Sequence, residues 1–138
     1  MAGFEYRYRL SGGAPTVQSF LFKDTEKLTK GDIANLESGE VDLGATADTN
    51  LLGPVQETKQ GTDSTTRIET IVDEDAVYGV RDANARKIGD TLDLAGATGA
   101  QGVAASSNKE FVVVAESSAT EETLVRINQD AHAFRRAQ

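Results

Sequence analysis

Three glycines, Gly96, Gly99 and Gly102, follow an apolar segment at three-residue spacing in LAGATGAQGVA (94–104). Such glycines let a loop approach a dinucleotide, whose pyrophosphate sits at the N-terminus of the following helix. The chemistry requires a buried parallel strand before the loop and a helix after it. Here the preceding DTLDL (90–94) alternates polar with apolar residues, and residues 103–110 are too few for a parallel crossover. We therefore predict no cofactor and a flexible connection between antiparallel strands.

Residues for acid–base or nucleophilic chemistry are scarce. His132 is the only histidine, and the chain contains no cysteine. A general base needs a packed pocket that orients it and sets its pKa. Because His132 lies in a polar C-terminal segment, we expect it on the surface. No serine stands in a nucleophile-elbow pattern, so we predict that the protein is not an enzyme.

Two acidic turns, DEDA (73–76) and GDTLD (89–93), could supply oxygen ligands to calcium. Neither has the spacing of the helix–loop–helix calcium motif. We interpret both as solvated turns and predict no metal site.

These residues lie among short segments in which polar and apolar residues alternate. In FEYRYRL (4–10) the aromatic residues and the leucine share one face, and the charged residues share the other. Similar segments, separated by turn residues, occupy 17–23, 32–37, 40–43, 51–57, 66–72, 76–80, 90–94, 110–116 and 123–128. We predict an all-β fold, a small β-barrel or β-sandwich of short antiparallel strands with little helix.

The expected organisation is one domain with two terminal segments. An N-terminal strand or arm covers residues 1–12, a single β domain covers 13–128, and a C-terminal tail covers 129–138. Residues 129–137 could form a terminal helix or an extended arm. At 138 residues the chain is long enough to bury a core of its own.

The chain contains a weak internal repeat. KGDIANL (30–36) and IGDTLDL (88–94) each place Gly-Asp before a short strand, and a loop of small residues follows. One interpretation is a duplicated hairpin-like unit. The other is a common turn, since glycine tolerates positive φ and aspartate bonds its neighbouring backbone.

The charge balance limits the classes of partner. The formal net charge is −8, whereas nucleic acid and anionic membranes attract clustered Lys and Arg. No apolar run approaches the roughly 20 residues of a membrane span. We expect no nucleic-acid partner, no membrane partner and a soluble intracellular product.

The two terminal segments are basic and aromatic within this acidic protein. Aromatic and arginine side chains are enriched at protein interfaces, and terminal segments are natural docking arms. The alternatives are that the first strand packs its aromatic residues into its own core and that the tail is disordered. The predicted interface residues are Phe4, Tyr6, Arg7, Tyr8, Arg9, Phe134, Arg135 and Arg136.

The stretch DEDAVYGVRDANARKIGDTLDLAGATGAQGVAASSNKEFVVVAESSATEETLVRIN (73–128) resembles the small Ala/Gly/Thr-rich β proteins that decorate or stabilise the heads of tailed bacteriophages and related viruses. The resemblance implies a virion structural protein that is made in the host cytoplasm and sits on the outer capsid surface, bound across neighbouring major capsid protein subunits. It also implies a homotrimer and a terminal arm laid along the shell. No catalytic residues transfer from this family.

Two other functions remain open from the sequence. One is a tail-tube or head–tail joining subunit, which shares a small β architecture. The other is a module that binds a carbohydrate or a host surface, although the chain has no tryptophan to form an aromatic platform. For the decoration role, we expect that removal of residues 1–9 or 129–138 leaves a folded domain that no longer binds the shell.

Overall fold

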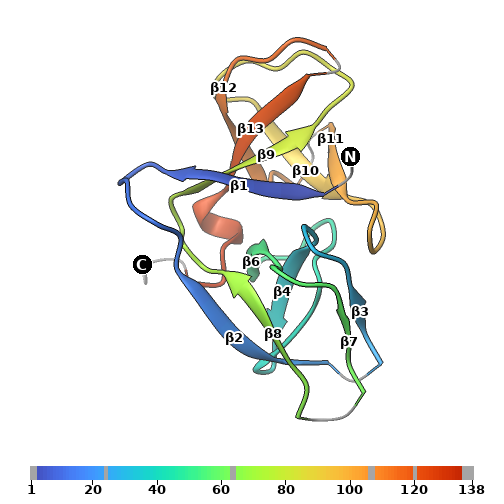
Figure 1. Ribbon diagram of the computed structural model, residues 1–138. Coiled ribbons are helices and arrows are strands. Elements are labelled where there is room, and N and C mark those ends of the chain that lie inside the picture. Colours follow the sequence, from blue (N-terminus) through green and yellow to red (C-terminus); the bar gives the residue numbers. More distant parts are fainter. Residues whose placement is uncertain (1–2, 24, 63–64, 106–107, 120, 135–138) are drawn as a thin grey trace.

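The computed structural model describes residues 3–23, 25–62, 65–105, 108–119 and 121–134, which form three sheets (Figure 1). The six-stranded sheet has the order β1 (Phe4–Arg9), β9 (Ala76–Arg81), β13 (Glu122–Ile127), β12 (Phe111–Ala115), β10 (Thr91–Ala95) and β11 (Gly102–Ala105). The five-stranded sheet has the order β6 (Leu51–Pro54), β4 (Ile33–Glu37), β5 (Glu40–Leu43), β2 (Val17–Phe22) and β8 (Arg67–Ile71). A short pair joins β3 (Lys27–Leu28) to β7 (Lys59–Gln60).

The prediction of an all-β fold with short strands and little helix is confirmed. All paired strands are antiparallel except β2 and β5, which run parallel. The described residues contain only one short helical segment, a 3₁₀ turn at Gln129–Ala131. The sheets do not close into a barrel, and their arrangement is sandwich-like, with the larger sheet above the smaller one in Figure 1.

Two apolar clusters hold the sheets together, and strands β4 and β6 contribute residues to both clusters. Ile33 and Leu51 face the cluster inside the six-stranded sheet, whereas their chain neighbours Ala34 and Leu52 face the cluster inside the five-stranded sheet. Successive side chains of a strand point to opposite faces. Strands β4 and β6 therefore bury residues on both faces, which explains why each begins with two apolar residues in succession.

The internal repeat corresponds to two units that share three strand pairs, although the β2–β5 pair of the first and the β12–β13 pair of the second have no counterpart. We define unit 1 as β2, β4, β5, β6 and β8, and unit 2 as β9 to β13. The antiparallel pairs β4–β5, β4–β6 and β2–β8 of unit 1 match β10–β11, β10–β12 and β9–β13 of unit 2. The units are thus larger than the hairpins that the sequence suggested.

The hydrogen bonds of the two Gly-Asp turns repeat at a constant offset of 58 residues. In unit 1 the Gly31 amide donates to Val55, whose amide donates to the Asp32 carbonyl, at 3.0 and 2.9 Å. In unit 2 the Gly89 amide donates to Val113, whose amide donates to Asp90, at 2.9 and 2.8 Å. Each aspartate side chain also accepts from the amide three residues earlier, at 2.8 and 2.9 Å. A common turn alone does not repeat these long-range bonds, so the structure favours a duplicated unit.

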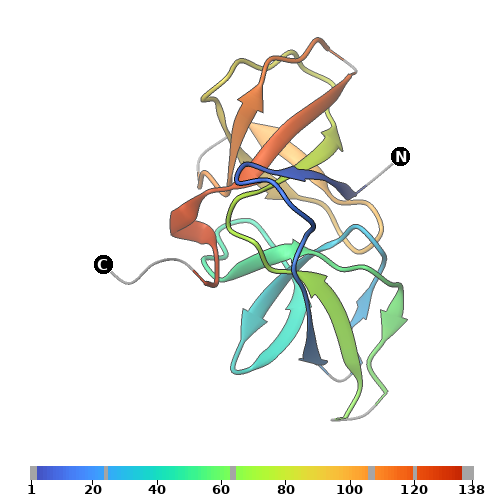
Figure 2. The ribbon, with the colours of Figure 1, turned by 60° about the vertical axis from the view of Figure 1, so that its left-hand side comes forward.

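Strand β1 lies between the two units (Figures 1 and 2). Along one edge it pairs with β9 of unit 2, and the Phe4 amide donates to the Gly31 carbonyl of unit 1 at 2.8 Å. An irregularity between Tyr6 and Tyr8 shifts the register. The expected single aromatic face is therefore broken: Phe4 is buried and Tyr6 half-buried, but Tyr8 is 42% exposed.

The described part of the tail, residues 129–134, folds back onto the body of the protein. Leu51 forms a β-bridge with His132, and the Ala133 amide donates to the Leu51 carbonyl at 2.8 Å. His132 is fully buried, so the expectation that it lies on the surface is wrong. The physical reason is that the 3₁₀ turn reverses the chain and lays these residues beside β6, between the two apolar clusters.

Candidate interaction surface

Arg7 of β1 is engaged by carboxylates of its own chain. Its guanidinium makes a two-pronged contact with Glu122 of β13, with Nε–Oε1 at 2.6 Å and Nη2–Oε2 at 2.5 Å, and a third contact with Glu5 at 2.9 Å. The hydrogen bonding of the guanidinium to the Glu122 carboxylate is the main cause of the raised pKa of Arg7. Arg7 thereby links β1 to β13 across β9. Its positive charge is paired with carboxylates of the same chain.

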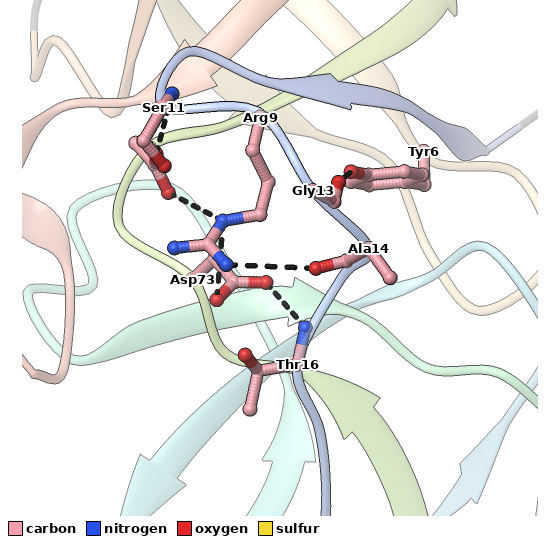
Figure 3. Close-up of polar contacts among 8 residues, drawn as sticks. Tyr6, Arg9, Ser11, Gly13, Ala14, Thr16 and Asp73 are labelled. Atoms are coloured by element: carbon pink, nitrogen blue, oxygen red, sulfur yellow. Dashed lines mark hydrogen bonds and ion pairs between the residues drawn. The ribbon is translucent and has the colours of Figure 1, made fainter.

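Arg9 is held in a second internal network, drawn in Figure 3. Its Nε lies 3.0 Å from an Asp75 carboxylate oxygen and 3.5 Å from one of Asp73, and Nη1 donates to the Ala14 carbonyl. The Thr16 amide donates to Asp73 at 2.6 Å. The arginine and these two aspartates fasten the β1–β2 connection to the turn before β9.

The acidic turn at residues 73–76 therefore has a structural role. The Ser11 amide and hydroxyl both donate to Asp75, and with Arg9 they hold the pKa of its carboxyl at about 2 despite the opposing effect of burial. Within the described parts of the chain, no group of three or more acidic or histidine side chains converges in a way that could hold a metal ion.

The remaining predicted interface residues are distributed between the core and the surface. Phe4 is 1% exposed and stacks on Phe111 with ring centroids 5.0 Å apart, which leaves it no surface for a partner. Tyr6 is half-buried and donates its hydroxyl to the Gly13 carbonyl. Tyr8 and Phe134 are each 42% exposed, and the Phe134 ring lies 6.3 Å from that of Phe20. Arg135 and Arg136 lie outside the described residues.

The glycine loop connects two antiparallel strands, as predicted, since β10 pairs with β11. The Gly99 amide donates to both oxygens of the Asp32 carboxylate at 3.1 Å, and the Thr98 hydroxyl donates to the Lys27 carbonyl. Burial raises the pKa of Asp32, and the hydrogen bonds from the backbone amides of Thr29 and Gly99 oppose that shift. The loop amides are thus used to join unit 2 to the Gly-Asp turn of unit 1.

The buried His132 is held in its neutral form. Its Nδ1 accepts a hydrogen bond from the Phe134 amide at 3.0 Å, which requires that nitrogen to carry no proton. Desolvation is the main cause that lowers its pKa to about 4, and Arg126 acts in the same direction. The sequence signal for this burial was weak, since only Ala131, Ala133 and Phe134 accompany the histidine.

Sequence reasoning missed an exposed apolar groove on unit 2. The groove is shallow, has a volume of about 460 Å³, and lies over β12 and the Gly-Asp turn of that unit. Its most exposed side chains are Leu10 at 52% and Ile88 at 68%. Val112 and Val114 of β12 and Arg126 of β13 also line the groove. A β-branched side chain at the tip of a turn gave a signal in the sequence, but one position alone does not predict a groove.

Comparison with known proteins leaves the chain without a family assignment, because no protein-family model and no curated protein sequence matches it. In the part of the chain that the structure describes, no helix has the length and apolar character to cross a membrane.

Proposed function

We propose that this protein is a structural protein of a virion, which decorates and stabilises the capsid by binding across neighbouring major capsid protein subunits. The single observation that carries the proposal is the exposed apolar groove of unit 2, formed in part by Leu10, Ile88 and Val112. Exposed apolar surface rimmed by polar residues is typical of a site that binds another protein. The resemblance of residues 73–128 to head decoration proteins supplies the identity of that partner.

Such a protein needs a rigid body more than it needs a reactive site. Each bound copy stabilises only the assembled shell, because it binds subunits that are adjacent there and nowhere else. The interlocked clusters and the Arg7 and Arg9 networks supply this rigidity, since they join β1 to both units. The acidic balance of the chain is compatible with an outward-facing position on the shell.

The structure changes how the binding surface must be tested. Removal of residues 1–9 would delete Phe4 from the core and the edge strand β1, and removal of 129–138 would delete buried Ala131 and His132. Because both truncations remove buried residues, a loss of shell binding in either one would not separate a binding role from a folding role. Surface substitutions must replace them.

The test is co-sedimentation of the purified protein with empty shells assembled from the major capsid protein of the source virus. We expect saturable binding, with a copy number that is a simple fraction of the number of capsid subunits. Shells that pellet without the protein at micromolar concentration contradict the proposal. A tail-tube or head–tail joining subunit would instead form rings or bind only at one vertex, and negative-stain images of the same samples distinguish these outcomes.

A further inference from the structure

The groove of unit 2 has a counterpart in unit 1. A groove of about 440 Å³ in unit 1 is lined in part by Lys30, Gly31, Val55 and Gln56. The residues 58 positions later, Ile88, Gly89, Val113 and Val114, all line the groove of unit 2. The duplicated units therefore carry the same surface depression, built from the Gly-Asp turn and the strand that hydrogen-bonds to it.

In unit 1 an extended strand completes this site. Phe4, Glu5 and Tyr6 of β1 form the remaining wall of the groove. The Phe4 amide donates to the Gly31 carbonyl at 2.8 Å, so the turn binds the backbone of the strand directly. The approach is close, since a Cβ placed on Gly31 would lie 3.3 Å from the Phe4 carbonyl oxygen.

In unit 2 the same site lacks a strand. Among the described residues, no amide donates to the Gly89 carbonyl, which is the counterpart of the Gly31 carbonyl. Ile88, the counterpart of Lys30, is 68% exposed, and Val112 and Val114 are only half-buried. Apolar residues thus stand where unit 1 presents a lysine, beside a free backbone acceptor.

The charge of the groove indicates what it accepts. Arg126 of β13 lies opposite Val112 in the sheet and is half-buried. Unlike Arg7, Arg9 and Arg86, it forms no ion pair within the described residues. A carboxylate brought into the groove would find a partly desolvated cation there.

We propose that the groove of unit 2 binds an extended segment of the major capsid protein, in the position that β1 occupies on unit 1. The bound segment donates a backbone amide to the Gly89 carbonyl, packs an apolar side chain on Ile88 and Val112, and places an acidic side chain against Arg126. This inference rests on the proposed function for the identity of the partner. Main-chain hydrogen bonds give such a contact its affinity, and the alternate side chains give it register.

A second copy of this chain fits the site less well. The strand that serves as the template, β1, is held in its own molecule by β9, by Gly31 and by the ion pairs of Arg7 and Arg9. It cannot be offered to a neighbour without opening that molecule. A segment of a different protein carries no such cost.

The test is site-specific photo-crosslinking on the shells used for co-sedimentation. The full-length variant Ile88→p-benzoylphenylalanine is compared with Lys30→p-benzoylphenylalanine, which places the same probe at the equivalent position of unit 1. We expect the probe at position 88 to yield a covalent product with the major capsid protein, mapped by mass spectrometry to one extended segment. The probe at position 30 should yield no capsid product.

Each other outcome overturns the inference. Shell binding without a capsid product from position 88, or equal products from both positions, shows that the segment binds elsewhere. A product joining two copies of this chain identifies a self-association groove instead. If the wild-type protein does not co-sediment with the shells, the proposed function is refuted, and this inference with it.

An affinity measurement on the same shells gives an independent readout. Because Ile88 is exposed, Ile88→Asp should leave the circular dichroism spectrum and the thermal midpoint unchanged. We expect it to weaken shell binding at least tenfold, as for an apolar residue at the centre of an interface. The control Lys30→Asp should change binding by less than twofold. Wild-type affinity of Ile88→Asp contradicts the proposal.

Discussion

Acidification should destabilise this protein through its single histidine. The folded-state pKa of His132 is about 4, mainly because burial disfavours the imidazolium, whereas an unfolded histidine titrates near 6.5. Between these values the unfolded state binds a proton that the folded state does not. The free energy of unfolding therefore falls as the pH falls from 6.5 to 4, and His132 contributes no further loss below pH 4.

The size of the loss follows from the two pKa values. The interval between 6.5 and about 4 corresponds to about 3 kcal/mol at 25 °C. A typical domain has a total stability of roughly 5–15 kcal/mol, so the effect is large enough to measure. Protonation at Nδ1 would also break the hydrogen bond from the Phe134 amide, which holds the tail against β6.

Urea unfolding at pH 7, 6, 5 and 4 measures this loss, with His132→Gln as the control. The variant retains every carboxylate, including Asp32 and Glu110 with raised pKa values and Asp75 with a lowered one, so their titrations cancel in the comparison. We expect the stability gap between wild type and variant to shrink by about 3 kcal/mol on acidification to pH 4. A constant gap, or a histidine NMR titration midpoint between 6 and 7, refutes the reasoning.

Three further predictions follow from the packing of the two units. Asp32→Ala should cost about 2 kcal/mol and Asp90→Ala about 1 kcal/mol in urea unfolding, because only Asp32 is buried and also binds a second amide; equal losses contradict this. Gly53→Ala should cost about 2 kcal/mol or more, since its Cβ would lie 2.3 Å from the Tyr78 hydroxyl, whereas Gly102→Ala, with open space at its Cβ, should be near neutral. Tyr78→Phe should be neutral or stabilising in thermal unfolding, because the buried hydroxyl has no hydrogen-bond partner among the residues that the structure describes; a clear loss of stability would reveal one.

The strands were predictable because their patterns are local. Segments such as 40–43 and 67–71 alternate or cluster apolar residues between turn residues, and the structure forms strands there. The two-residue strands β3 and β7 and the Gly/Ala-rich β11 were not predicted. Their sequences carry little periodicity, and they pair because neighbouring strands bring their backbones together.

The exposure of the predicted interface residues could not be read from the sequence, because tertiary contacts decide it. An arginine in a basic segment looks available for a partner, but Arg7 and Arg9 are paired with carboxylates from residues 122, 73 and 75, far away in the sequence. The bulge near Tyr8 shifts the register of β1, so that Tyr8 is exposed although Phe4 is buried. The groove of unit 2 was also out of reach, since its residues come from four separate segments and only the duplicated hydrogen bonds reveal its relation to β1.

The most direct test of the central claim is quantitative mass spectrometry of purified virus particles from the source. The number of copies of this protein is measured relative to the major capsid protein. Our account predicts a ratio near one or a simple fraction of it, which corresponds to binding across the whole shell. Absence from the particle, or only a few copies in each, would contradict a capsid-decorating role.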